Sequence, residues 1–185
     1  MSRRSVSNEP KLIAAAKAGS AEAFADLVRS YRERLLRFLL TRSSSYADAE
    51  DVLQDTLIAA FRYLHSYDPR WRFSTWLYRI AIRNAAKQHT PDLVEIGDLH
   101  DEESDPLQQC IVDSETDNLW LTARQLLNDE VFAAMWLRYA EDMSVNDIAK
   151  SLDRSASWTK VNLMRGRRAL ESHMNGAADK SEAYG

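Results

Sequence analysis

The sequence predicts an all-α protein made of two small helical domains that are joined by a flexible acidic linker. Apolar residues recur at spacings of three and four along most of the chain, and only five glycines and four prolines interrupt its 185 residues. No segment alternates apolar and polar residues as a half-buried strand would. The expected divisions are a first domain at 1–90, the linker at 91–118, a second domain at 119–175 and a disordered tail at 176–185.

Four helices are expected in the first domain. A short apolar pattern over residues 12–16 indicates the first helix, which ends at Gly19, and Ser20 is placed to cap the second. The polar run at 41–45 interrupts the second helix. Its apolar face follows helical spacing and comprises Phe24, Leu27, Val28, Tyr31, Leu35, Phe38 and Leu39.

A third, longer helix from about Asp48 has two opposed faces. Asp48, Asp51 and Asp55 fall three and four residues apart, so they share one side of a helix and suit a basic partner. The opposite side faces the core and comprises Ala49, Val52, Leu53, Leu57, Ala60, Phe61 and Leu64. Because Asp68-Pro69 breaks this helix, Ser74 or Thr75 is expected to start the fourth.

Arginines and aromatic residues crowd into the fourteen residues from 70 to 83. Guanidinium groups suit phosphates, and aromatic rings suit unstacked bases, so this cluster points to nucleic acid. Trp76 is expected to be buried, because Leu77 and Ile80 share its surroundings. The members of the cluster are Arg70, Trp71, Arg72, Phe73, Trp76, Tyr78, Arg79 and Arg83.

The net charge of −4 does not exclude nucleic-acid binding, because the charge is segregated along the chain. Residues 1–90 hold 15 basic against 9 acidic side chains, residues 91–118 hold 10 acidic and no basic ones, and the remainder balances. Cys110 is the only cysteine, and the four histidines are scattered, so we expect no metal or other cofactor. No apolar run is long enough for a membrane span or a signal peptide, which favours the cytoplasm.

A helix-turn-helix pattern lies in the second domain, after apolar periodicity over residues 119–139. Ser144 and Asp147 have capping-box spacing at the start of a short helix, and Asp153 tolerates the left-handed backbone of the turn. The second helix is expected to enter the major groove of DNA. Residues 154–168 contain five Lys or Arg and no acid. Lys160, with Ser157 and Asn162, is the predicted base reader.

Three segments, in this order, resemble extracytoplasmic-function sigma factors, the smallest class of bacterial RNA polymerase initiation subunits. DAEDVLQDT is similar to the core-enzyme-binding helix of sigma region 2, and FSTWLYRIA is similar to the promoter-reading helix of that region. MSVNDIAKSLDRSASWTKVNLMRGRRAL resembles the helix-turn-helix of region 4. The resemblance implies a non-enzymatic initiation factor that binds core polymerase and the minus-10 and minus-35 promoter elements and assists promoter opening.

The resemblance also implies a role for particular residues. The beta-prime clamp of the polymerase would bind Asp48, Glu50, Asp51, Gln54 and Asp55. The minus-10 element would contact Arg70, Trp71, Arg72, Phe73, Ser74, Thr75, Arg79, Arg83 and Asn84. The minus-35 element would contact Arg154, Ser155, Ser157, Trp158, Lys160, Asn162 and Arg165.

Further partners follow from the same resemblance: the polymerase beta flap and an anti-sigma factor, with no small-molecule substrate. In this family the linker runs toward the active centre and the RNA exit path of the polymerase, where its ten acids could imitate RNA. Asparagine commonly lies seven residues after the tryptophan that corresponds to Trp76. Here Arg83 has that place, and the asparagine is Asn84.

Three other functions are alternatives. A helix-turn-helix regulator with a partner-sensing N-terminal bundle would bind DNA without polymerase. An adaptor that mimics a sigma factor would keep the acidic helix and open no promoter. An enzyme would need a phosphate loop, clustered metal ligands or a nucleophile paired with a base, and the sequence contains none of these patterns.

Overall fold

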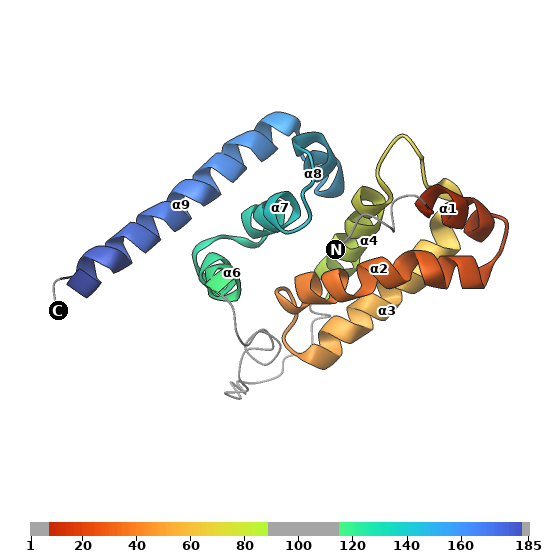
Figure 1. Ribbon diagram of the computed structural model, residues 1–185, viewed down its shortest axis with the longest axis horizontal. Helices are drawn as coiled ribbons and strands as arrows, with labels where there is room; N and C mark the ends of the chain where they lie inside the picture. Colours follow the sequence, from red (N-terminus) through yellow and green to blue (C-terminus); the bar gives the residue numbers. More distant parts are fainter. Residues whose placement is uncertain (1–7, 89–114, 183–185) are drawn as a thin grey trace. The chain divides into compact units, whose positions relative to one another are not determined.

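The computed structural model describes residues 8–88 and 115–182, and within these ranges every regular element is a helix. The predicted all-α fold is confirmed. The chain divides into two compact units, Met1–Pro106 and Leu107–Gly185, which are described separately below. Figure 1 shows helices α1 to α4 in the first unit and helices α6 to α9 in the second.

Two helices open the first unit. Helix α1 (Glu9–Lys17) is followed by Gly19, whose φ of 102° lies in the left-handed region that glycine adopts without strain. Helix α2 (Ala21–Leu40) then begins with the predicted cap, because the Ser20 side chain accepts a hydrogen bond from the Ala23 amide. The two helices pack together, and the predicted apolar face of α2 is buried.

Helices α3 and α4 complete this unit. Helix α3 (Tyr46–Tyr63) begins two residues before the expected start and is capped by Ser45, and a single 3-10 turn, η1 (Leu64–Ser66), follows it. After the loop at 67–72, helix α4 (Phe73–Gln88) packs on α3 and also touches α2. An open groove of about 500 Å³ runs between the later turns of α3 and α4, with Ile58 and Asn84 in its walls.

The second unit has an aromatic core. Helix α6 (Glu115–Leu126) packs against helix α7 (Asp129–Tyr139), which is capped by the Asn128 side chain. The Trp120 ring lies 5.8 Å from Phe132 and 4.9 Å from Trp136, centroid to centroid. Tilted aromatic pairs at these distances stabilise a core beyond the area they bury.

Helices α8 (Val145–Ser151) and α9 (Ala156–Glu182) form the predicted helix-turn-helix. The Ser144 side chain caps α8 by accepting a hydrogen bond from the Asp147 amide, and Asp153 has a φ of 54° in the turn. The predicted cap and the predicted left-handed residue are both confirmed. Helix α9 approaches α7 closely at Gly166. A Cβ placed there would lie 3.1 Å from Met135.

Both ends of the second unit differ from the sequence prediction. Helix α6 begins at Glu115, inside the predicted linker, and α9 continues to Glu182, inside the predicted tail. Alanine, lysine and glutamate favour helix in the tail segment, and a helix that is already nucleated extends at little cost. The linker prediction for 91–114 lies outside the described residues, as does Cys110. None of the described helices is both long and apolar enough to cross a membrane.

Candidate functional site

The outer side of α3 presents the predicted acidic face. Asp51, Gln54 and Asp55 are exposed on consecutive turns, and Asp48 is half-buried. Glu50 differs from them, because it accepts a hydrogen bond of 2.8 Å from Arg32 on α2 and another from Tyr46. The free carboxylates of this face are therefore concentrated at Asp51 and Asp55, while Glu50 helps to hold α3 on α2.

An apolar extension of this face was not predicted. Ile58 follows Asp51 and Asp55 along the same side of α3, and 49% of its surface is exposed. Phe61 was expected in the core, but it is 44% exposed and contacts the Phe24 ring at the edge of the bundle. The shared spacing of 51, 55 and 58 could have revealed this extension. Helical periodicity does not tell which apolar residues lie at the border of a buried face.

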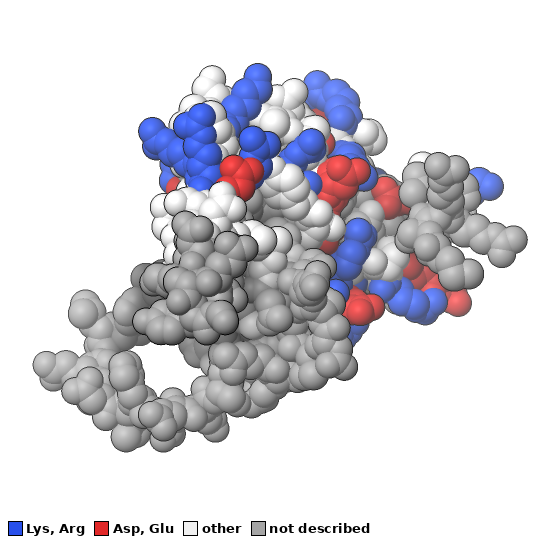
Figure 2. Space-filling view, turned by 60° about the vertical axis from the view of Figure 1, so that its left-hand side comes forward, with Lys and Arg blue, Asp and Glu red and all other residues white. Residues whose placement is uncertain are grey.

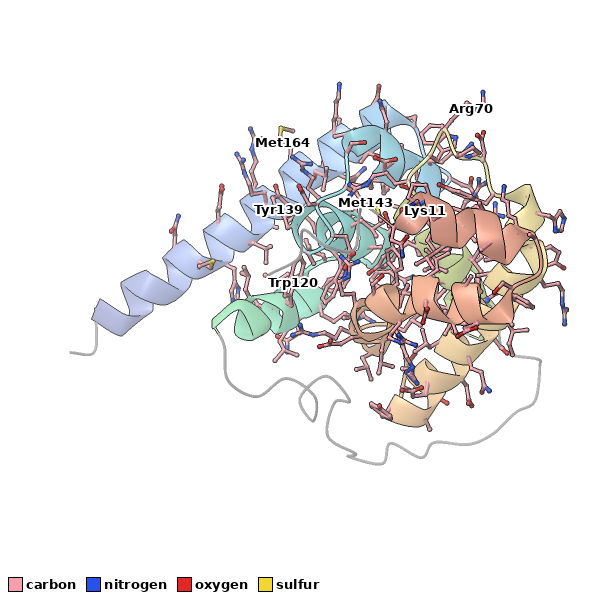
Figure 3. The ribbon with its side chains drawn as sticks, turned by 45° about the vertical axis from the view of Figure 1, so that its right-hand side comes forward. Lys11, Arg70, Trp120, Tyr139, Met143 and Met164 are labelled. Atoms are coloured by element: carbon pink, nitrogen blue, oxygen red, sulfur yellow. The ribbon has the colours of Figure 1, made fainter. Side chains whose placement is uncertain are left out.

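The loop before α4 carries exposed cations. Arg70 and Arg72 are exposed, and Trp71 is half-buried. Arg70 forms an ion pair with Asp68, in which Nη2 lies 2.6 Å from Oδ2 and Nε lies 2.8 Å from the same oxygen. This hydrogen bond and the charge of Asp68 raise the pKa of Arg70. Figure 3 shows Arg70 on the outer side of the loop.

The first turn of α4, which was assigned to the minus-10 contact, is enclosed. Phe73, Ser74 and Thr75 are buried, with Phe73 fully enclosed. The Phe73 ring lies 5.5 Å from both Tyr31 and Tyr67. Because the Phe73 ring is fully buried, it has no face open to stack on a base unless its surroundings unfold. Trp76 was expected to be buried but is half-buried, and its ring packs against Tyr67 and Phe73.

Farther along α4, exposure separates the remaining predicted contacts. Arg83 is exposed and Arg79 is half-buried. Asn84 is also half-buried, and its Nδ2 lies 3.4 Å from Thr56 Oγ1 on α3. Arg83 stands where the family commonly has asparagine, and the asparagine follows at position 84. As a result, the Arg83 cation lies at the surface and the Asn84 amide lies against α3.

The helix-turn-helix presents its predicted readers unequally. Ser157, Lys160 and Arg165 are exposed on α9. By contrast, Ser155 accepts a hydrogen bond from the Trp158 amide, and Asn162 Nδ2 donates to the Trp158 carbonyl at 2.9 Å. Both side chains keep further hydrogen-bonding capacity toward DNA, because the Ser155 hydroxyl can still donate and Asn162 retains Oδ1 and a second amide hydrogen.

Two further predicted minus-35 contacts take part in packing. Trp158 is half-buried, and the Arg154 guanidinium lies 5.6 Å from its ring centroid. Arg154 also forms an ion pair with Glu130 on α7. Val161 and Met164, which were not predicted, are exposed between the basic residues of α9.

Local charge, rather than net charge, characterises these surfaces. In the upper part of Figure 2, Lys and Arg side chains outnumber Asp and Glu. Because exposed charges are screened over about 8 Å at physiological ionic strength, such a patch acts through its own local charges and not through the net charge of the chain. Among the residues that the structure describes, no group of three or more His, Cys, Asp or Glu side chains could hold a metal ion.

The fold and its surfaces define a class of protein: a two-unit helical protein with an acidic helix face, a cationic loop and a helix-turn-helix. Residues 27–91 match the family described as Sigma-70 region 2. Together with the relatives below, this match shows that the chain belongs to the extracytoplasmic-function sigma factors of the sigma-70 family. The chain is an RNA polymerase sigma factor.

Relatives from three bacteria match nearly the whole chain. The ECF RNA polymerase sigma factor SigW of Bacillus subtilis is 26% identical over 178 residues, covering 89% of this chain and 95% of the relative. The ECF RNA polymerase sigma-E factor of Haemophilus influenzae is 28% identical, covering 87% and 92%. The RNA polymerase sigma-H factor of Pseudomonas aeruginosa is 29% identical, covering 88% and 92%.

Two solved structures share the fold. CnrH, solved in complex with the cytosolic domain of CnrY, has a TM-score of 0.67 and 21% identity, covering 91% of this chain and 97% of its own. The sigma factor RpoE of Bartonella quintana, solved with the anti-sigma factor NepR, has a TM-score of 0.64 and 20% identity, covering 84% and 98%. At such identities, these likenesses establish the fold alone.

Proposed function

We propose that this sigma factor binds core RNA polymerase through α3, selects promoters at a minus-10 and a minus-35 element, and assists strand opening. The observation that carries the proposal is that acidic side chains and basic or aromatic side chains are exposed on different elements of the first unit. An exposed acidic row lies on α3, whereas the loop before α4 exposes arginines and a tryptophan. One surface suits a basic protein, and the other suits a DNA strand.

The polymerase contact is assigned to Asp51, Gln54 and Asp55, with Asp48 at the edge. Exposed carboxylates gain little from isolated ion pairs, but a complementary basic surface orients the partner and speeds association. Glu50 is assigned a supporting role because it already pairs with Arg32. The beta-prime clamp is the proposed partner of this face, and the beta flap is a second proposed contact of the polymerase.

The minus-10 contact is assigned to the loop and to the exposed side of α4, through Arg70, Trp71, Arg72, Arg79 and Arg83. Arginines would hold the phosphates, and a half-exposed tryptophan would stack on a base of the opened strand. Unstacking a base costs a few kcal/mol, and stacking on an aromatic side chain returns about 1–3 kcal/mol. Opening would therefore be driven by binding, without hydrolysis.

The minus-35 contact is assigned to the first half of α9. Ser157, Lys160 and Arg165 lie exposed on a helix that can enter the major groove, and Arg154 flanks it. An anti-sigma factor is the proposed regulator; the Bartonella quintana protein of the same fold was solved with one. The relatives named as polymerase sigma factors support a site of action with the polymerase in the cytoplasm.

Reconstitution tests the proposal. The purified protein and bacterial core polymerase should form one complex in gel filtration and transcribe from specific sites in genomic DNA; mapping those starts would supply the promoter elements. DNA binding without polymerase would instead favour a helix-turn-helix regulator with a partner-sensing bundle. A folded sample that forms no complex and gives no specific transcript would overturn the proposal.

Charge reversal tests the α3 interface. Asp51→Lys with Asp55→Lys should weaken the complex with core polymerase by at least about tenfold, because like charges would then face a basic partner. Asp26→Lys with Glu33→Lys is the matched control: it reverses two exposed acids on α2, one of which makes only an exposed pair with Arg29. Equal affinity of the α3 variant and the control would show that α3 is not the interface.

A further inference from the structure

The loop that carries Arg70, Trp71 and Arg72 is tied at both ends to one buried residue, Tyr67. This tyrosine follows η1 and is 6% exposed. Its hydroxyl donates a hydrogen bond of 2.6 Å to the Trp71 carbonyl, across the loop. Its own amide donates to the Leu64 carbonyl at 3.1 Å, so the loop begins from a fixed point.

A second tie comes from α1. Lys17 Nζ donates a hydrogen bond of 2.8 Å to the Tyr67 carbonyl, and the same ammonium lies 5.4 Å from the centroid of the Tyr67 ring. One lysine thus holds both the backbone and the ring of Tyr67. Lys17 is the last residue of its helix, where a cation is also favoured by the helix dipole.

Two aromatic side chains of α4 also pack against the Tyr67 ring. Its centroid lies 5.5 Å from that of Phe73 and 5.6 Å from that of Trp76. Burial is the main cause that raises the pKa of Tyr67, and the charges of Glu9 and Asp68 add to it. The hydroxyl therefore stays a proton donor to the Trp71 carbonyl.

Inside the loop, Asp68 shapes the chain locally. The Arg70 amide donates to Asp68 Oδ1 at 3.0 Å, and the Trp71 amide donates to the Asp68 carbonyl at 3.1 Å. These bonds form a turn, but a turn alone does not fix its orientation on the bundle. The bonds of Tyr67 and Lys17 supply that orientation.

We infer that Tyr67 and Lys17 are positioning residues, which hold the loop at 68–72 in one conformation for capture of the opened DNA strand. The inference rests on the proposed function of that loop. Ordering a loop upon binding costs affinity, so a loop that is ordered beforehand binds its strand more tightly. Losing one such hydrogen bond should weaken strand binding by roughly 2- to 12-fold.

The test compares substitutions that keep the packing. Tyr67→Phe removes only the hydroxyl, Lys17→Met removes the ammonium, and Lys17→Arg restores a cation that can donate. Tyr63→Phe is the matched control, because it removes the hydroxyl of a tyrosine on α3 that is 52% exposed. All four proteins should bind core polymerase with wild-type affinity.

Two measurements are made on each protein. Hydrogen exchange of the free protein should be faster over residues 68–72 in Tyr67→Phe and Lys17→Met, and near wild type in Lys17→Arg and Tyr63→Phe. Fluorescence anisotropy of the polymerase complex should show the same ranking for binding of a single-stranded oligonucleotide that carries the minus-10 element of a mapped promoter. A merely structural role would lower core binding as well.

The outcomes separate this inference from the proposed function. If wild-type protein forms the polymerase complex and binds the oligonucleotide, but Tyr67→Phe equals wild type in loop exchange or in DNA affinity, the positioning role is wrong. If wild-type protein forms no polymerase complex, the proposed function fails, and the positioning role fails with it. The expected result is faster hydrogen exchange of the loop and weaker strand binding in Tyr67→Phe, with neither change in Tyr63→Phe.

Discussion

At the scale of single residues, Tyr31 connects pH to the stability of the first unit. Burial raises the pKa of Tyr31 well above its usual 10.0; a hydrogen bond to Glu9 and the charge of that carboxylate raise it further, and Arg34 and Arg72 oppose the shift. The folded state therefore keeps this proton at a pH where the unfolded chain has lost it. The resulting stability is complete below pH 10.0 and declines as pH rises above it.

Replacing this tyrosine should change the pH dependence. The free energy of unfolding of wild-type protein should fall between neutral pH and about one unit above the usual pKa, and Tyr31→Phe should flatten this slope. Urea unfolding followed by circular dichroism at both pH values measures it. Tyr139→Phe, at a site 54% exposed in the second unit, should keep the wild-type slope. A Tyr31→Phe slope as steep as that of wild type would contradict the assignment.

Residue type and spacing predicted a helix cap and a turn correctly, but they did not predict which side chains are buried. Ser20 and Asp153 were predicted correctly because a cap and a left-handed turn depend on neighbours within a few residues. Phe73 was assigned to DNA, yet it is buried against Tyr31, which lies 42 positions earlier in the chain. Such burial depends on tertiary packing, which local spacing does not contain.

At the scale of helices, the contact between α7 and α9 depends on Gly166. An added Cβ would lie 3.1 Å from Met135 and 3.2 Å from Val131, both of which are buried. Gly166→Val should therefore reduce the stability of the second unit by about 1–3 kcal/mol, although valine is the better helix former. Thermal unfolding followed by circular dichroism measures the loss.

The control for this helix contact lies three residues farther along α9. Ala169 is exposed, so Ala169→Val adds the same branched side chain outside the contact and should cost only about 0.5 kcal/mol. If Gly166→Val were as stable as Ala169→Val, the close approach of the two helices would not be needed for packing.

Helix boundaries were harder to predict than helix faces. All seven predicted core residues of α2 are buried because they repeat the helical period, while Ala23 and Leu40 at the two ends of the helix are also buried and were not predicted. Helix α3 begins two residues before the expected aspartate, since Ser45 provides a cap that apolar periodicity does not reveal. Exposed Ile58 was missed because the acidic residues alone defined the outer face.

At the scale of the whole molecule, the charge is divided along the chain. The basic excess lies in residues 1–90, and the compensating acids lie at 91–118. A net charge of −4 is therefore compatible with a protein that binds DNA through separate local patches. The chain also divides into two compact units, each of which carries one proposed DNA contact.

A bipartite promoter contact predicts that the two units act on different parts of the DNA. Lys160 on α9 is exposed and assigned to the minus-35 element, so Lys160→Ala should weaken promoter binding by the polymerase complex. The loss should be about 1–3 kcal/mol if Lys160 reads a base edge. If Lys160 contacts only a phosphate, the loss of binding free energy should be smaller, and the slope of log K against log salt concentration should decrease in magnitude by about one.

The promoter itself is the control that isolates this contact. When the minus-35 element of a mapped promoter has been scrambled, Lys160→Ala should no longer reduce promoter affinity through a lost base contact. Arg72→Ala should weaken binding to the intact and to the scrambled promoter, because its loop is assigned to the minus-10 element. Lys150→Ala removes an exposed charge from α8 and controls for nonspecific attraction. Electrophoretic mobility shift at two salt concentrations measures all three variants. An equal effect of Lys160→Ala on intact and scrambled promoters would show that α9 contributes only sequence-independent attraction.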